Sequence, residues 1–310
     1  MGLSTSLEKS EKSELTVEFS NLSAFWRLIA DYGSIYARDG MQSTFVTSTF
    51  PNHYTMATGL YQESHGIVAN QIYDKNAKKT INLPDDTRDN RLAYLYGGEP
   101  IWRTVEKQLG PGKSACFMWT GCQNDNLTHF VPFQSNVSWT RTVENVTDLL
   151  KTGVSLIMLY NDEPDHIGHK KGTSSNEINR MLVEIDDQME YLMDRLEENG
   201  YLTKNTTTDE NVNLIIVSDH GMLDITQYVL IKPRNELFTI TIENYAYLHI
   251  DPQPGKASKT MEYLRSIPNI VVYNKSEIPE KWGYKNNDRI GQIIVVALPH
   301  FGITLKEPKS

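Results

Sequence analysis

Two kinds of hydrophobic pattern stand out along the 310 residues of this chain. Residues 174–200 carry apolar side chains at three- and four-residue spacing, which predicts a long amphipathic helix. Short, continuous apolar runs at 154–160 and 213–218 lie on either side of it and have the length of buried strands. Strand, helix and strand in this order predict a βαβ unit with two parallel strands.

Other elements follow from weaker patterns. Ser174 and Glu177 predict a capping box at the start of the long helix. Residues 1–20 are polar and charged and are expected to form a disordered lead-in. Residues 21–310 contain no repeat or low-complexity linker, so one α/β domain is expected there. Further helices are predicted over residues 22–37, 100–108 and 256–267, and further strands over 114–119, 239–250, 269–273 and 292–297.

Charge and cysteine content narrow the function classes. The formal net charge of −9 argues against a protein that binds nucleic acid duplexes by neutralising their phosphates. Cys116 and Cys122 could form one bridge or stay free, and two cysteines make no disulfide framework. No run of about 18 apolar residues predicts a membrane span, and the first residues lack the apolar core of a secretory signal.

The stretch Thr47–Asn70 has an unusual density of chemically active residues. Thr49 directly precedes Phe50 and Pro51, and the residues that follow are compatible with a helix. A hydroxyl at a helix N-terminus lies where backbone N–H groups and the helix dipole favour an anion, so phosphate chemistry is one interpretation. An N-cap hydroxyl with proline in the first turn is the commoner structural interpretation.

Polar clusters follow both predicted strands of the βαβ unit. Asp165 and His169 come after the first strand, and Asp219 and His220 come after the second. Because parallel strands end at the same edge of a sheet, the two clusters are expected at one edge, where α/β proteins place their sites. Carboxylate and imidazole ligands without thiolates suit Zn²⁺ or another first-row divalent ion.

These blocks carry a family resemblance. The segments TFPNHYTMATGLYQESHGIVAN, EPDHIGH and SDHGM resemble the ectonucleotide pyrophosphatase/phosphodiesterase family, a branch of the alkaline phosphatase superfamily. The resemblance implies an alkaline-phosphatase-like α/β fold, with a largely parallel central sheet and helices on both faces. It also implies that Thr49 is the nucleophile and that Asn70 helps to hold the phosphoryl oxygens.

The same resemblance implies two Zn²⁺ ions. Asp165 and His169 match ligands of one ion, while Asp219 and His220 match ligands of the other, which also holds Thr49. Tyr160 matches a tyrosine of the substrate pocket, and Phe50 matches an aromatic residue beside the nucleophile.

The chain departs from the family pattern at both ends. The family pattern has an aspartate after its first strand and a histidine block late in the chain, and neither is found here. The chain is therefore expected to be truncated relative to the family and to lack two metal ligands. Asp39 follows a helix rather than a strand, and His300 comes too early to be the late histidine. Residues 273–290 resemble the short family members that lack a nuclease-like tail.

The expected function is zinc-dependent hydrolysis of phosphodiester or pyrophosphate bonds through a threonine nucleophile. The expected partner is a small phosphodiester, with a nucleotide favoured over a choline lipid, and contact with a membrane is expected only through segments outside this chain. An extracellular or cell-surface location is expected, and six glycosylation sequons begin at Asn21, Asn126, Asn136, Asn145, Asn205 and Asn274.

Two alternatives remain open at this point. The chain could be a fragment or pseudoenzyme that acts as an extracellular binding module. A phosphomonoesterase or sulfatase could share the fold, although Thr49 argues against a sulfatase, which needs a modified cysteine or serine.

Overall fold

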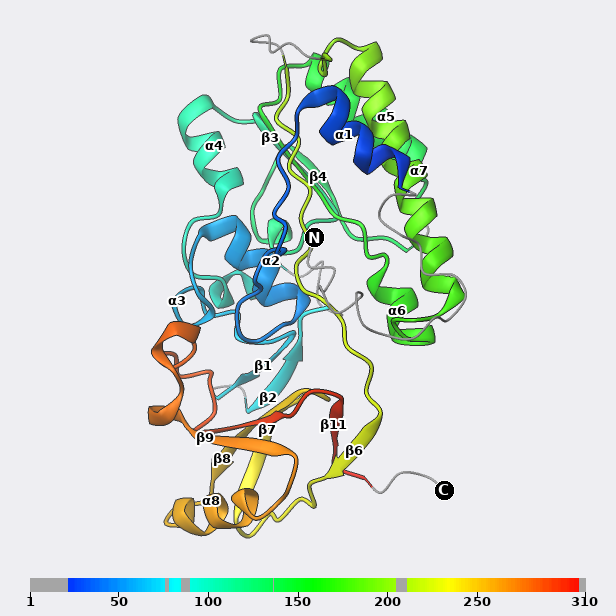
Figure 1. The fold of residues 1–310 in the computed structure, drawn as a ribbon. Coiled ribbons are helices and arrows are strands. Elements are labelled where there is room, and N and C mark those ends of the chain that lie inside the picture. The colour runs from blue at the N-terminus through cyan, green and yellow to red at the C-terminus, as the bar shows by residue number, and fades with distance from the viewer. Residues whose placement is uncertain (1–21, 76–77, 85–89, 136, 205–210, 307–310) are drawn as a thin grey trace. The chain divides into compact units, whose positions relative to one another are not determined.

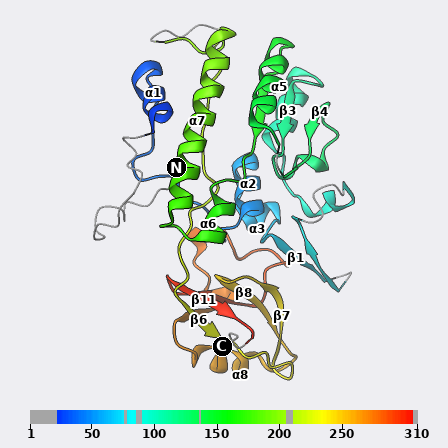
Figure 2. The ribbon, with the colours of Figure 1, turned by 90° about the vertical axis from the view of Figure 1, so that its right-hand side faces the viewer.

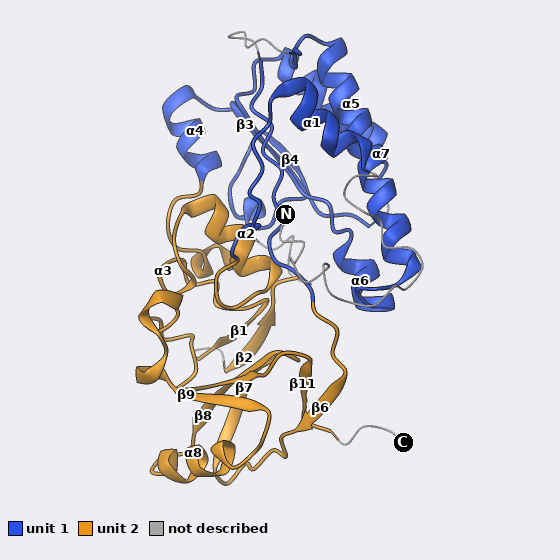
Figure 3. Ribbon diagram, in the orientation of Figure 1, with its two compact units in different colours: residues 1–42, 101–222 blue, residues 43–100, 223–310 orange. Residues whose placement is uncertain are grey.

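The computed structural model describes residues 22–75, 78–84, 90–135, 137–204 and 211–306 (Figure 1). The predicted lead-in over residues 1–20 lies outside them. The chain divides into two compact units, residues 1–42 with 101–222 and residues 43–100 with 223–310 (Figure 3). Each unit is built from discontinuous stretches of sequence. The expectation of one domain over residues 21–310 stays a prediction.

Unit 1, residues 1–42 with 101–222, contains a three-stranded parallel sheet. Strand β3 (Ser114–Phe117) lies between β4 (His129–Val131) and β5 (Leu156–Leu159). Phe117 pairs with Leu159, so the carboxyl ends of β3 and β5 coincide. The predicted strands at 114–119 and 154–160 are therefore present, and the chain after each leaves from one edge of the sheet.

Helices cover both faces of this sheet (Figure 1). Side chains alternate along β3, so successive residues contact helices on opposite faces. Ala115 and Phe117 pack against α5 (Trp139–Lys151) in a buried apolar cluster. On the opposite face, the Ser114 hydroxyl donates to Glu106 of α4 (Ile101–Leu109) at 3.1 Å. This is the layered α/β arrangement that the sequence pattern predicts.

The long helix α7 (Asn176–Glu198) packs its apolar face against α1 (Ser23–Tyr32) and α5 (Figure 2). Buried Asp186 of α7 accepts hydrogen bonds from the backbone N–H groups of Ala24 and Phe25, at 3.1 and 3.2 Å. The α7 carboxylate thereby caps α1, whose own N-cap, Leu22, has no capping side chain.

Three predictions in unit 1 need correction. Ser175, not Ser174, caps α7, because its hydroxyl accepts from the N–H of Ile178. The helix expected over residues 22–37 ends at Tyr32, where Gly33 adopts a left-handed conformation.

The strand expected over residues 213–218 is also wrong, since the structure assigns no strand there. Leu214 packs against the α7 cluster, but Ile215 is 81% exposed. An apolar run needs a partner strand to form a sheet, and none of the described strands pairs with this one. The predicted βαβ unit therefore has its first strand and its helix, but not its second strand.

Unit 2, residues 43–100 with 223–310, begins with two helices and a hairpin. Helix α2 (Thr49–Thr58) is followed by the short α3 (Gln62–His65), the antiparallel strands β1 (Gln71–Asp74) and β2 (Lys79–Asn82), and a 3₁₀ helix, Asn90–Leu95. The hairpin falls in a stretch whose polar sequence shows no strand period.

A four-stranded antiparallel sheet supplies much of the remaining unit 2 core. Its order is β7 (Phe238–Glu243), β8 (Tyr247–Pro252), β10 (Ile293–Ala297) and β9 (Ile270–Asn274), and α8 (Ala257–Arg265) packs beside it. The single strand expected over residues 239–250 is thus a hairpin. Strands β6 (Gln227–Leu230) and β11 (Phe301–Thr304) form a parallel pair that the sequence pattern did not predict.

Candidate functional site

Thr49 is the first residue of α2, as its position before Phe50 and Pro51 predicts. The residue at the N-cap, Ser48, is extended and makes no side-chain capping bond. Its hydroxyl instead lies 3.2 Å from the buried hydroxyl of Tyr247 on β8. Ser48 is therefore an N-cap residue whose side chain does not cap the helix, and Thr49 is partly exposed at the helix start.

Asn70 lies at the same helix N-terminus. Its side-chain oxygen accepts a hydrogen bond from the N–H of Phe50 at 2.9 Å. Pro51 has no N–H, and the N–H of Asn52 bonds to the carbonyl of Ser48. The first-turn N–H groups that the sequence suggested as anion donors are thus largely used up or missing.

Two polar residues that sequence reasoning missed hold Thr49 from within α2. Asn52, only 3% exposed, accepts from the N–H and hydroxyl of Thr44 and donates to the carbonyls of Val46 and Ser48, all at 2.9–3.0 Å. His53 donates from Nδ1 to the carbonyl of Thr49 at 2.8 Å. A signal was present in the sequence, since both polar residues directly follow Phe50 and Pro51 in the first turns of α2.

The first candidate ligand pair lies on α6 (Asp165–Lys171) in unit 1. Asp165 occupies the first turn of α6 and His169 the next, which brings Asp165 Oδ2 within 3.5 Å of His169 Nε2. Among the described residues, Asp165 Oδ1 is buried and has no hydrogen-bond partner. A buried carboxylate oxygen without a donor calls for a cation or a ligand.

The second pair follows residues 213–218. Asp219 Oδ2 lies 3.4 Å from His220 Nε2. His220 Nδ1 lies 2.9 Å from the carbonyl of Gly221, which can only accept, so Nδ1 carries the proton and Nε2 offers its lone pair. A histidine held in this way through its other nitrogen is typical of metal ligands.

The spacing of both pairs fits a tetrahedral ion. Bonds of about 2.0–2.1 Å from a zinc ion to two ligands place those ligands about 3.3–3.4 Å apart. The atom pairs of Asp165 with His169 and of Asp219 with His220 are 3.5 and 3.4 Å apart. In the described part of the chain, no three such side chains gather as a group that could hold a metal. Each pair is thus spaced as two ligands of one ion would be, and the described residues bring no third carboxylate or imidazole to either pair.

Tyr160 connects these pairs to the sheet. Its N–H donates to the carbonyl of Phe117 at 3.1 Å, which extends the pairing of β3 and β5 by one residue. Burial raises the pKa of its hydroxyl, and the carboxylates of Asp219 and Asp165 raise this pKa further. Both ligand pairs thus contribute negative potential at the carboxyl end of β5, which favours a cation there.

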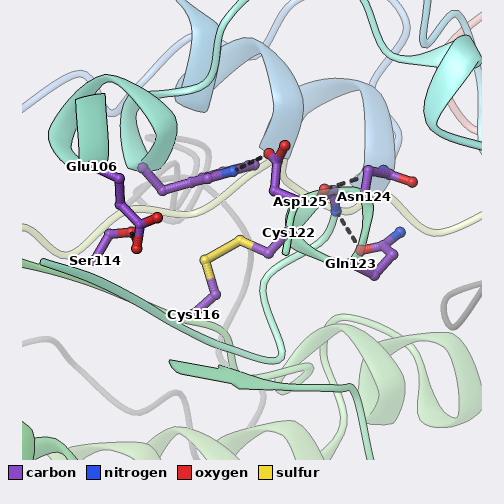
Figure 4. Close-up of a disulfide and its surroundings, with 9 residues drawn as sticks. Glu106, Ser114, Cys116, Cys122, Gln123, Asn124 and Asp125 are labelled. Carbon is purple, nitrogen blue, oxygen red and sulfur yellow. Dashed lines mark hydrogen bonds between the residues drawn. A yellow bond between two sulfur atoms is a disulfide. The ribbon is translucent and has the colours of Figure 1, made fainter. Parts of the chain in front are cut away.

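A disulfide fixes the chain that leaves β3. Cys116 and Cys122, both fully buried, are bonded across six residues (Figure 4). Gln123, at a position where the family often has an acid, accepts from the N–H of Gly121 at 2.9 Å. Asp125 binds the indole N–H of Trp102 at 2.7 Å. The two states that the sequence left open for the cysteines are therefore resolved in favour of the bridge.

The candidate residues fall into one group in each unit. Thr49, Phe50 and Asn70 lie together in unit 2, at the start of α2. Tyr160 and the ligand pairs lie in unit 1. Asp39 is in an exposed turn of unit 1, and His300 is exposed in unit 2, where it faces the carbonyl of Asp224.

Comparisons with known proteins bear on this arrangement. The family model for type I phosphodiesterase / nucleotide pyrophosphatase matches residues 13–310. Human bis(5'-adenosyl)-triphosphatase ENPP4 is 36% identical over 283 residues, which are 86% of this chain and 59% of that protein. The chain thus spans about three fifths of the length of this relative.

Solved structures of murine ectonucleotide pyrophosphatase / phosphodiesterase 5 have a similar fold. One matches with a TM-score of 0.81 at 29% identity, covering 93% of this chain and 77% of that one. Another, an inactive threonine-to-alanine variant in complex with AMP, matches with a TM-score of 0.80 at 29% identity and covers 93% and 76%. These matches confirm the expected α/β fold of the alkaline phosphatase type, and the family model covers nearly the whole chain. The chain belongs to the type I phosphodiesterase / nucleotide pyrophosphatase family.

Proposed function

We propose that this protein hydrolyses phosphodiester or pyrophosphate bonds of nucleotides, with Thr49 as the nucleophile. The observation that carries the proposal is the joint placement of Thr49 and Asn70 at the start of α2, where Asn70 Oδ1 is bound to the N–H of Phe50. We infer that the amide nitrogen of Asn70 donates to a group held beside Thr49. A hydroxyl and an amide donor at one helix start suit attack on a phosphoryl group.

The reaction follows from these positions. Thr49 Oγ1 forms a bond to phosphorus while the bond from phosphorus to the leaving oxygen breaks, and water then hydrolyses the phosphothreonine ester. Asn70 donates to a phosphoryl oxygen throughout. His53 holds the carbonyl of Thr49, and Asn52 holds the residues before it, so the attacking oxygen is positioned by groups that do not touch the substrate.

Zinc fits the ligand pairs. Asp165 and His169 would hold one ion, and Asp219 and His220 would hold another. Bound zinc supplies Lewis-acid chemistry, which lowers the pKa of a hydroxyl and offsets charge on phosphoryl oxygens. The unpartnered Asp165 Oδ1 and the orientation of His220 support these assignments.

A nucleotide is the substrate we favour. The matched human relative is a bis(5'-adenosyl)-triphosphatase, and the matched murine structure holds AMP. The family resemblance assigns Tyr160 to the substrate pocket and Phe50 to a position beside the nucleophile. A base offers a flat apolar face to such side chains, whereas a choline headgroup needs a cage for a cation.

An extracellular or cell-surface location and glycosylation complete the proposal. The Cys116–Cys122 bridge is typical of proteins from oxidising compartments. Of the sequons in the described residues, Asn126 and Asn145 are exposed. Asn21, Asn136 and Asn205 lie outside those residues. No described helix has the length and apolar composition that a membrane crossing requires.

Turnover of bis(5'-adenosyl) triphosphate by the zinc-loaded chain tests the nucleophile. Thr49→Ala should lower kcat/KM by at least about 1,000-fold, because no other group replaces the attacking oxygen. Thr49→Ser should keep measurable turnover. Thr58→Ala, at the other end of α2, removes a hydroxyl that binds the carbonyl of Tyr54 and should change turnover little. Full activity of Thr49→Ala would overturn the proposal.

Zinc content after gel filtration tests the ligand pairs. Asp219→Ala and Asp165→Ala should each lower the zinc bound per chain, while Asp148→Ala, an exposed acid on α5, should not. Folded protein that binds nucleotide but shows neither zinc nor turnover would favour the extracellular binding module instead.

A further inference from the structure

Strand β8 of unit 2 carries a row of polar side chains inside an apolar core. Tyr247 and His249 are two residues apart, which places their side chains on one face of β8. Tyr247 is 4% exposed, and His249 and the neighbouring Tyr284 are fully buried. Around Tyr247 and Tyr284 lie apolar residues such as Val46, Val68, Ala69, Ile278 and Ile294. Buried polar groups in such surroundings are costly unless each has a partner.

The partner of Tyr247 lies directly before the nucleophile. The Tyr247 hydroxyl is 3.2 Å from the hydroxyl of Ser48, although 199 residues separate them in sequence. Ser48 is the N-cap of α2 and is joined to Thr49 by one peptide bond. The Tyr247 bond therefore fixes the point at which the chain enters the nucleophile helix.

His249 reaches the segment that carries Asn70. The N–H of Gly291 points to His249 Nδ1 at 3.5 Å, so Nδ1 accepts and Nε2 carries the proton. His249 Nε2 then donates to the hydroxyl of Tyr284 at 2.9 Å, and Tyr284 donates to the carbonyl of Val68 at 2.5 Å. Val68 is two residues before Asn70. This directional relay fixes the second arm of the candidate site.

Gly291 is required for the relay to form. A Cβ atom at this position would lie 2.9 Å from the backbone nitrogen of Ile250 and 3.0 Å from the Cβ of His249. Only glycine brings the N–H this close to β8, so the relay is built into the backbone as well as the side chains.

We propose that Tyr247, His249 and Tyr284 are positioning residues, which set the separation of Thr49 and Asn70 from one face of strand β8. This inference deepens the proposed function and rests on it. An all-apolar core at these positions would pack without the need to satisfy any polar group. The polar residues instead form bonds that end on the two chain segments of the candidate site, at Ser48 and at Val68.

Amide hydrogen exchange in the full chain tests the proposal without relying on activity. The N–H of Phe50 reports on its bond to Asn70, and the N–H of Val295, in the centre of the same unit, reports on general unfolding. Tyr247→Phe and Tyr284→Phe should each speed exchange at Phe50 by about 10-fold, which corresponds to about one hydrogen bond, while exchange at Val295 stays unchanged. Equal acceleration at both amides, or none at Phe50, would overturn the proposal.

A matched variant and a second removal complete the design. Tyr263→Phe also deletes a tyrosine hydroxyl that binds a backbone carbonyl, that of Lys232, and should leave exchange at Phe50 as it is. If Tyr247→Phe does not fold, Ser48→Ala removes the same bond from its other side, and the same exchange pattern is expected.

Turnover separates this inference from the proposed function. If the unchanged chain hydrolyses nucleotide diesters, Tyr247→Phe and Tyr284→Phe should lower kcat about 10-fold with little change in KM, since they move the attacking group and not the substrate pocket. Unchanged kcat in both variants would contradict the inference. A chain without any turnover would contradict the proposed function alone, and the exchange data would still decide the positioning role.

Discussion

The two groups of candidate residues are held in different ways. In unit 2, Asn52 lies beside Thr49, is buried, and uses all of its side-chain donors and acceptors. In unit 1, the His169 side chain is 72% exposed, and the carboxylate oxygen Oδ1 of Asp165 has no donor among the described residues. The residues around the nucleophile are held in place by other protein groups. The ligand residues are arranged as they would be around a metal ion.

This difference shows which of the two groups contributes to the stability of the fold. Polar groups around the nucleophile are part of the core, so changes there should act on folding and on chemistry together. In the ligand pairs, the His169 side chain is largely solvated, so changes at His169 should act on metal affinity and leave folding alone. Variants that separate the two effects can break or sharpen the comparison.

Acid should produce the largest effect, and it should act on unit 2. Burial lowers the pKa of His249 to about 3 and that of His65 to about 4, from an ordinary value of 6.5. Both are neutral in the folded protein, while the unfolded chain takes up their protons below pH 6.5, so stability falls as the pH falls toward 4. Each histidine should remove about 2 kcal/mol between pH 7 and pH 5. Urea unfolding measures this loss of stability, with amide hydrogen exchange used to monitor each unit separately.

A variant makes the acid effect specific. His65→Gln should reduce the pH dependence of unit 2 by about half, whatever it does to stability at pH 7. A stability of unit 2 that stays flat between pH 7 and pH 5 would mean that these histidines are not neutral and buried, and the contrast between the two groups would fail.

Asn52→Ala should produce the next largest effect. The substitution leaves the N–H of Thr44 without its side-chain acceptor, and it removes one of the two donors that reach each of the carbonyls of Val46 and Ser48. We expect a loss of about 3 kcal/mol in the free energy of unfolding, together with a fall in turnover. Asn176→Ala, at the exposed start of α7, is the control and should cost less than about 0.5 kcal/mol. A similar cost for the two variants would remove the distinction.

The disulfide should contribute a smaller amount in unit 1. Replacing both Cys116 and Cys122 by serine removes a crosslink between residues six positions apart. This should lower the free energy of unfolding by about 2 kcal/mol. Denaturant unfolding of the double variant against the oxidised parent gives the value. An increase in stability would show that the bridge opposes the native packing of β3.

His169→Ala should produce the smallest effect on folding. The imidazole is largely in water, so the metal-free protein should change by less than about 0.5 kcal/mol. The same variant should weaken zinc binding, measured by competition with a chelator, by at least about 10-fold. Loss of stability without loss of zinc affinity would show that His169 is structural.

The sequence predicts elements whose own pattern decides their structure. The α7 helix, the strands β3 and β5, and the helix start at Thr49 all have local signals of spacing, length or turn chemistry. Residues 213–218 have the same kind of signal as β5, but whether an apolar run becomes a strand depends on a partner, which the run itself does not encode. The same limit explains why the hairpin β1 and β2 was missed.

The candidate site divides along similar lines. The ligand pairs were found because carboxylates and histidines follow two apolar runs, whereas Thr49 and Asn70 were assigned through the resemblance of their segment to the family. Tyr247 and Tyr284 were not found, because they reach the site across 199 and 216 residues and look like ordinary aromatic positions. Burial and long-range hydrogen bonds, which only the fold reveals, make them part of the site.

The discontinuity of unit 2 has a consequence for synthesis of the protein. Ser48 and Val68 leave the ribosome long before their partners Tyr247 and Tyr284, with separations of 199 and 216 residues. At a synthesis rate of about 5–20 residues per second, the strand that holds the nucleophile segment is made about 10–40 s after that segment. During that interval its apolar side chains lack the strand that covers them in the folded unit, so exposed apolar surface is expected at the segment that carries the proposed chemistry.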